Sequence, residues 1–152
     1  PSQYSWIFGS NAFGFIAASQ LNAYLLRRGY AMLHILRIAI LLPALVSSCL
    51  LAAELLGFNS LILLLIGFFS YIASLGFISP NAGAAAMANH GHQAGTASAL
   101  MGVLQFGLAS IIGATLGFWP SVSALPILTL MAICGVGGLL WHRLVLPKAA
   151  TN

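Results

Sequence analysis

Hydrophobic residues run almost without interruption through five segments of the chain, and short groups of turn-forming residues separate these segments. A transmembrane helix needs about 20 largely apolar residues, and each of the five segments meets this requirement. The predicted spans are Tyr4–Leu26, Ala31–Leu56, Ser60–Ala88, Gly95–Phe118 and Leu125–Leu146. The links between them are rich in Gly, Asn, Pro and Ser, as turns are, and they are short enough to make consecutive spans antiparallel. The pattern therefore predicts an all-α, polytopic membrane bundle of five transmembrane helices.

Composition excludes a soluble domain. Hydrophobic residues make up 61% of the chain and charged residues 4%, whereas about a quarter of the residues in soluble proteins are charged. The formal net charge of +4 comes from five basic residues and one acid. So few charges cannot form a nucleic-acid footprint, so we expect membrane lipids and no nucleic acid as partners.

The basic residues predict the orientation in the membrane, because short cytoplasmic loops retain Lys and Arg. Arg27 and Arg28 follow the first span, and Arg143 and Lys148 close the last. With five spans these two ends lie on the same side, which predicts an external N-terminus and a cytoplasmic C-terminus. An odd number of spans with this orientation fits the back part of a larger protein.

The stretch between residues 79 and 117 is rich in Gly, Ala and Ser. Pro80 lies inside the third span, where it cannot donate to the carbonyl of Gly76 and is expected to kink the helix. Gly102, Gly113 and Gly117 recur at helical spacing in the fourth span. Small residues let helices approach closely in lipid, so this stretch predicts two helices packed tightly against each other, with or without a role in transport.

Two motifs resemble a known transporter family. Ser79–Ala82 followed by Ala94–Gln105 resembles the junction of the tenth and eleventh helices of the bicyclomycin-resistance (Bcr/CflA) drug-efflux family of the major facilitator superfamily. Ser19–Arg28 resembles the end of that family's eighth helix, and Asn11 matches a polar position earlier in it. The loop after Arg28 departs from the superfamily pattern because it has no further basic residue before Arg37.

The resemblance implies that residues 1–152 are helices eight to twelve of a twelve-helix transporter, a partial major facilitator fold without its N-terminal six-helix bundle. It implies efflux of drug-like, amphipathic molecules across the bacterial inner membrane by alternating access. Proton-coupled antiport would then depend on acids in the missing half, because the single acid, Glu54, lies at the outer end of its span.

Polar residues within the spans are the candidates for function. In the superfamily fold the eighth, tenth and eleventh helices line the central cavity. The candidate cavity residues on the corresponding spans are Asn11, Phe15, Tyr71, Asn81, Gln105 and Phe106. Amides can equally join helices, and aromatic residues can face lipid or core. Arg37 lies about 9 Å into its span and is expected to snorkel to the headgroups or form a structural ion pair.

Other readings remain open at this point. The chain could be a non-transporting membrane module that assembles through its glycine-rich helix faces. His90 and His92, with Ser98 nearby, raise a metal or enzymatic alternative, but no Cys, Asp or Glu lies close enough to complete a zinc site. We therefore expect no cofactor, no metal and no catalytic residue. Cys49 and Cys134 are predicted to be small core residues.

Overall fold

Every element of the part of the chain that the structure describes is an α-helix. The structure is a computed structural model that describes residues 2–58, 60–88, 93–118 and 123–149. Its helices are α1 (Ser2–Arg27), α2 (Met32–Ala39), α3 (Leu41–Leu55), α4 (Leu61–Met87), α5 (Ala94–Gly117) and α6 (Leu125–Ala149). The all-α class is therefore confirmed, and the predicted spans coincide with these helices to within a few residues, the second span being divided into α2 and α3.

The division between α2 and α3 follows from a proline. Ile40 remains in the right-handed helical region, at φ −71° and ψ −16°, and its N–H donates to the carbonyl of Leu36 at 3.0 Å. Pro43 has no N–H to donate to the carbonyl of Ala39, which interrupts the hydrogen-bond pattern one turn earlier. α2 and α3 therefore act as one membrane-spanning unit, Met32–Leu55.

Four of the five predicted spans are long and apolar enough to cross a membrane. Among the described residues these are Met32–Leu55, Leu61–Met87, Ala94–Gly117 and Leu125–Leu144. α1 has 26 residues and thus the length to span, but it is more polar than the others because it carries Asn11, Gln20 and Asn22 together with several serines. The first predicted span is therefore a helix of spanning length without the apolar character of the other four.

Two glycines end their helices with the same hydrogen-bonded turn. Gly29 follows α1 with φ +88°, and Gly57 follows α3 with φ +79°. After α1, Gly29 donates to the carbonyl of Leu26 at 3.0 Å and Tyr30 to that of Leu25 at 3.2 Å. This is a Schellman arrangement, which pairs the last carbonyls of the helix and needs a residue with positive φ. The same pattern of bonds follows α3, so both turns are fixed by local sequence.

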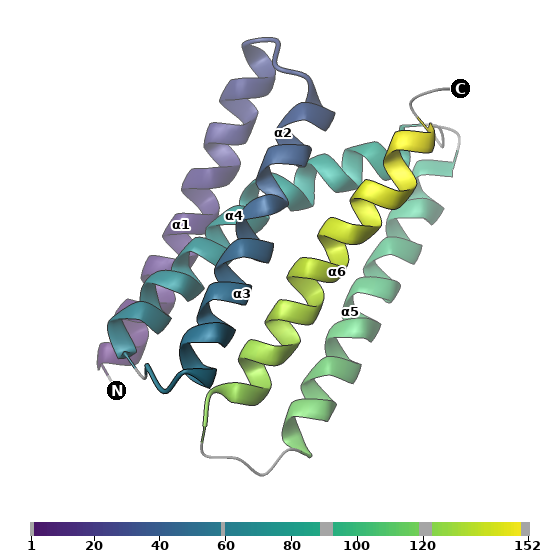
Figure 1. Cartoon of the computed structure of the whole chain (residues 1–152). Helices are drawn as coiled ribbons and strands as arrows, with labels where there is room; N and C mark the ends of the chain where they lie inside the picture. The colour runs from purple at the N-terminus through teal and green to yellow at the C-terminus, as the bar shows by residue number, and fades with distance from the viewer. Residues whose placement is uncertain (1, 59, 89–92, 119–122, 150–152) are drawn as a thin grey trace.

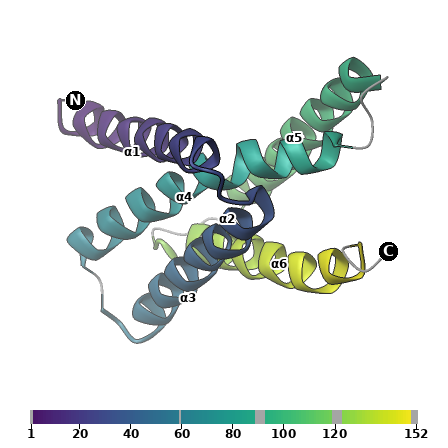
Figure 2. The ribbon, with the colours of Figure 1, turned by 90° about the horizontal axis from the view of Figure 1, so that it is seen from above.

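Helix α4 lies at the centre of the bundle. It packs against α1 on one side and against the α2–α3 unit on the other, and α6 packs against α3 (Figures 1 and 2). α5 lies at the edge, beside α6 and the end of α4, and none of its described residues is buried. The N-terminal end of α1 and the C-terminal end of α6 lie at opposite ends of the bundle (Figure 1), as expected for an odd number of consecutive antiparallel spans.

Glycines allow three of the helix pairs to approach closely. A Cβ added at Gly76 of α4 would lie 2.5 Å from the carbonyl oxygen of Phe15 in α1, and one at Gly135 of α6 would lie 2.9 Å from that of Pro43 in α3. A Cβ at Gly67 of α4 would meet the side chain of Leu50 in α3. These contacts hold backbones together at distances that larger residues would prevent.

The glycines singled out in α5 have no such role within this chain. A Cβ added at Gly102, Gly113 or Gly117 would meet nothing within 4 Å. The physical reason is the edge position of α5, which touches α4 and α6 only sparsely. Close packing of these three glycines therefore stays a prediction, and the surface that they would pack against is not among the described residues.

Both cysteines are exposed and free, so the prediction of core positions for Cys49 and Cys134 was wrong. An apolar side chain gains little from burial when lipid is the alternative solvent, and hydrophobicity alone does not place a residue inside a membrane protein. The large number of exposed Leu, Ile and Phe side chains on the described helices has the same explanation.

Candidate functional site

α1 and α4 run parallel, and their contacts set the depth of the candidate residues. Gly14 faces Phe69, Ala18 faces Gly76 and Asn22 faces Asn81. This register places Tyr71 of α4 at about the depth of Phe15 in α1, one turn from Asn11. Asn11 and Tyr71 are half-buried and Phe15 is 37% exposed. Tyr71 lies about 40° around α4 from Gly67, which packs against α3, so it shares the depth of Phe15 but not the α1-facing side of α4.

Asn22 and Asn81 form the most buried polar contact between two helices. Nδ2 of Asn81 donates to Oδ1 of Asn22 at 2.7 Å and to the carbonyl oxygen of Phe77 at 2.9 Å. Nδ2 of Asn22 donates back to Oδ1 of Asn81 at 3.4 Å. Their side chains are 2% and 1% exposed. The structure therefore places Asn81, predicted to line a cavity, in a satisfied pair between α1 and α4.

Pro80 lies beside this pair and inside α4, which continues as a helix to Met87. In Figure 1 the second half of α4 runs at an angle to its first half. Pro80 leaves the carbonyl of Gly76 without its usual helical donor, and Gly76 is the point where α4 approaches the backbone of α1 most closely. The bend and the amide pair thus belong to the same region of the interface.

α5 carries an amide at the centre of an apolar helix. Gln105 lies midway along Ala94–Gly117. The half-buried residues Met101, Ile112 and Leu116 lie on the same helical face as Gln105, so this face turns toward the bundle. Gln105 itself is exposed, and it makes no hydrogen bond to another described residue. Phe106 is 75% exposed and lies to one side of this face.

α4 meets α5 only near their shared turn. Ser98 Oγ lies 3.2 Å from Sδ of Met87, and a Cβ at Gly83 would lie 3.6 Å from the terminal methyl of Met101. Beyond this contact the two helices separate. The structure thus places Asn11 and Phe15 one turn apart on α1, puts Tyr71 on the side of α4 that faces α3, and leaves Gln105 and Phe106 on a separate helix at the edge.

None of the six cavity candidates lines either of two prominent pockets on the described part of the bundle. The first, of about 440 Å³, lies between the end of α1, the α2–α3 unit and α4. Its walls are apolar apart from Ser74, whose hydroxyl already donates to the carbonyl of Tyr71 at 2.6 Å. A ligand site needs a few free polar groups, so this pocket has the chemistry of a contact for a hydrocarbon chain.

The second pocket, of about 550 Å³, is basic. It is lined by Arg37, Leu41, Leu139, His142 and Arg143. Arg37 therefore faces a pocket between the α2–α3 unit and α6, and no ion pair forms on it within the described chain. His142, although it lies in the last turns of α6, is only 7% exposed.

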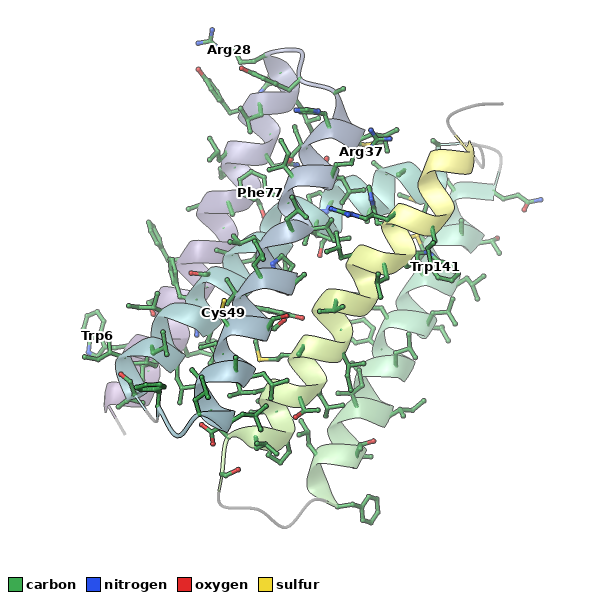
Figure 3. The ribbon with its side chains drawn as sticks, in the orientation of Figure 1. Trp6, Arg28, Arg37, Cys49, Phe77 and Trp141 are labelled. Atoms are coloured by element: carbon green, nitrogen blue, oxygen red, sulfur yellow. The ribbon has the colours of Figure 1, made fainter. Side chains whose placement is uncertain are left out.

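The arginines gather toward one end of the bundle. Figure 3 shows Arg28 and Arg37 toward the same end and Trp6 toward the other. Arg28 stacks over the ring of Tyr24 at 5.1 Å from its centroid, and Arg27 is exposed in the last turn of α1. Glu54 is half-buried in the last turn of α3, near the opposite end. The charges thus separate as the sequence predicted, while the side of the membrane to which each end belongs stays a prediction.

The structure does not test the metal or enzymatic role suggested by the two histidines of the turn between α4 and α5. His90 and His92 lie outside the described residues. Within the residues that are described, no group of three or more His, Cys, Asp or Glu side chains could hold a metal ion. Ser98, the nearby hydroxyl, donates to the carbonyl of Ala94 at 2.8 Å, its own helical turn.

Sequence reasoning missed three features. The first is the break between α2 and α3, although Pro43 is a plain signal for it in the sequence. The second is the partner of Asn22, because no local pattern could pair this amide with a residue 59 positions away. The third is the burial of His142 in the pocket that Arg37 also lines, which left no sequence signal because these two residues meet only after the α2–α3 unit and α6 pack.

Comparison with known proteins gives one informative similarity. Over 156 aligned residues the chain is 30% identical to YdgK of Bacillus subtilis (strain 168), named an uncharacterized MFS-type transporter. The alignment covers the whole of this chain and 37% of that protein, so the chain spans little more than a third of its relative's length. No family model matches the chain, and no solved structure matches it significantly. The similarity supports membership of the major facilitator superfamily and does not assign a family within it.

Proposed function

We propose that this chain is part of a transporter that moves small, drug-like amphipathic molecules out of the cell by alternating access. The observation that carries the proposal is Gln105. A polar group at the centre of a membrane helix is costly unless it is paired or faces water. Gln105 occupies that position, on the face of α5 that turns toward the bundle, and makes no hydrogen bond to another described residue. A substrate or water in a central cavity supplies the partner it needs.

The rest of the uncovered surface supports the same proposal. Transporter sites lie near the bilayer midplane, between two repeats or bundles that rock against each other. α1 carries half-buried Asn11 with Phe15 one turn away, and α5 carries Gln105 with exposed Phe106. Drug pockets combine apolar or aromatic walls with a few polar groups, and these residues have that composition.

The proposal extends to the whole protein. The chain contributes helices eight to twelve, and the seventh helix and a six-helix bundle complete the transporter. The share of the relative that the chain covers, 37%, is close to five helices in twelve. Proton coupling then depends on acids outside this chain, whose single acid is Glu54, and the narrower likeness to the Bcr/CflA efflux family gives the substrate class.

Efflux from cells tests the role of Gln105. The full-length protein that carries this chain is expressed in an efflux-deficient bacterium loaded with a fluorescent amphipathic dye. Gln105→Leu removes the amide at the inward face. Val103→Leu places the same side chain about 160° around the helix, at a residue that is 70% exposed. We expect an efflux rate about three- to tenfold lower for Gln105→Leu and little change for Val103→Leu, at equal protein abundance.

Equal rates for both variants would overturn the role of Gln105. Collapse of the proton gradient should stop efflux by the unaltered protein, and efflux that continues would refute antiport. A protein that exports no dye, yet loses its oligomeric state when Gly113 and Gly117 are both replaced by Leu, would instead support the membrane module that assembles through glycine-rich faces.

A further inference from the structure

The basic pocket between the α2–α3 unit and α6 has no role in the proposed transport. Its lining brings together Arg37 from α2 with His142 and Arg143 from α6. Arg37 lies 105 positions or more from the other two in sequence, and the packing of α3 against α6 brings them to one site. The cavity measures about 550 Å³, which exceeds the volume of a phosphate group.

The positive charge in this pocket has no acidic side chain beside it among the described residues. The sequence contains one acid, Glu54, which lies 17 residues beyond Arg37 and therefore about 25 Å away along the helix axis. No ion pair forms among the described residues. Two guanidinium groups at a membrane helix surface need an anion or water to offset the cost of leaving water, and the described side chains supply no such anion.

His142 supplies the second, independent sign of a ligand. Its side chain is 7% exposed, and its Nε2 atom is buried with no hydrogen-bond partner. Buried polar atoms are nearly always hydrogen-bonded. An acceptor placed in the pocket that His142 lines would satisfy this nitrogen when it carries the proton.

The depth of the pocket matches the headgroup region. Arg37 lies five residues after the start of α2 at Met32, and Arg143 lies six residues before the end of α6 at Ala149. Both distances correspond to about 8–9 Å along a helix, which a long arginine side chain can cover to reach phosphates. Arginine is the residue best suited to bidentate phosphate contacts.

We propose that Arg37, Arg143 and His142 form a binding site for the phosphate of an anionic phospholipid, with the acyl chains following the apolar outer surface of the bundle. Basic pockets between transmembrane helices bind such headgroups in other proteins. The site is distinct from the face that carries Gln105, and it does not depend on the proposed transport. A bound lipid here would join α6 to the α2–α3 unit.

Lipid retention measures this site directly. The full-length protein is purified from mixed micelles with equal amounts of phosphatidylglycerol and phosphatidylcholine, and bound lipids are counted by native mass spectrometry. We expect a preference for phosphatidylglycerol that falls about fivefold for each arginine removed in Arg37→Gln and Arg143→Gln. The matched control, Arg27→Gln with Arg28→Gln, removes the same charge at the same end but outside the pocket, and should keep the preference.

Several outcomes would overturn the site. Equal retention of the two lipids by the unaltered protein would do so, as would equal losses in the pocket and control variants. Displacement of lipid by excess inorganic phosphate, with phosphate retained in its place, would assign the pocket to a free anion. If the Gln variants fail to fold, Arg37→Lys with Arg143→Lys decides the question, because it keeps the charge and should retain a reduced preference; no preference in that folded variant would contradict the proposal.

Discussion

Asn22 and Asn81 exchange side-chain hydrogen bonds across the interface of α1 and α4, beside the proline of α4. The bond from Asn81 to Asn22 is 2.7 Å long and the return bond 3.4 Å. Both side chains are almost fully buried, so neither amide can turn to water. The pair joins two helices that glycine already allows to approach closely at Gly76.

Replacing either member of this pair should destabilise the bundle more than replacing both. Asn22→Leu leaves Oδ1 of Asn81 buried without its donor, and Asn81→Leu leaves the amide of Asn22 unpaired; we expect each to lower the free energy of unfolding by about 1–2 kcal/mol. The double variant should recover part of this loss. Unfolding titrations in mixed micelles measure the four proteins, with a coupling energy of about 0.6–1.7 kcal/mol expected. Strictly additive losses would show that the two amides do not interact.

Gly76→Ala should be far more damaging than Gly113→Ala, although both add one methyl group to a helical glycine. At Gly76 the new Cβ would lie 2.5 Å from the backbone oxygen of Phe15, which cannot move without separating α1 from α4. At Gly113 it meets nothing within 4 Å. We expect a loss of about 1–3 kcal/mol at Gly76 and a change within about 1 kcal/mol at Gly113. Equal thermal stability of the two variants would contradict the close approach of α1 and α4.

Gly29 should tolerate Asn better than Ala. Its φ of +88° lies in the left-handed region, where a residue with a Cβ costs about 1–2 kcal/mol and Asn is the least disfavoured replacement. A Cβ at Gly29 would meet nothing within 4 Å, so the whole loss would come from backbone strain. Gly95→Ala, in an equally open place without positive φ, is the matched control. If calorimetry gives Gly29→Ala the same loss of stability as this control, the predicted backbone strain at Gly29 is wrong.

Labelling should decide the orientation of the bundle. Cys49→Ala and Cys134→Ala remove the two exposed thiols and should change stability by less than about 0.5 kcal/mol. In that background Tyr30→Cys and Phe58→Cys place single thiols in turns at opposite ends, at residues 55% and 68% exposed. Because basic loops stay in the cytoplasm, a membrane-impermeant maleimide should label position 30 only in inside-out vesicles and position 58 only from outside. The reverse pattern would invert the predicted topology.

The sequence alone determined the helices of this protein and their ends. Long apolar runs, glycine at two helix ends and proline within two spans are local features, and each acts on the backbone where it occurs. Clustering of the arginines toward one end followed from the order of the spans. The candidate amides Asn11, Asn81 and Gln105 are likewise visible in the sequence as polar groups in apolar helices, without any indication of their partners.

Only the tertiary structure decided which face of each helix packs. Several spans are apolar all round, so no stripe of hydrophobic residues marks an inner face, and lipid accepts the same side chains that a core would. For this reason Cys49 proved to be exposed, Gly76 rather than Gly113 became a close contact, and Asn81 met Asn22. Such contacts depend on the shapes of two surfaces brought together, which a single stretch of sequence does not contain.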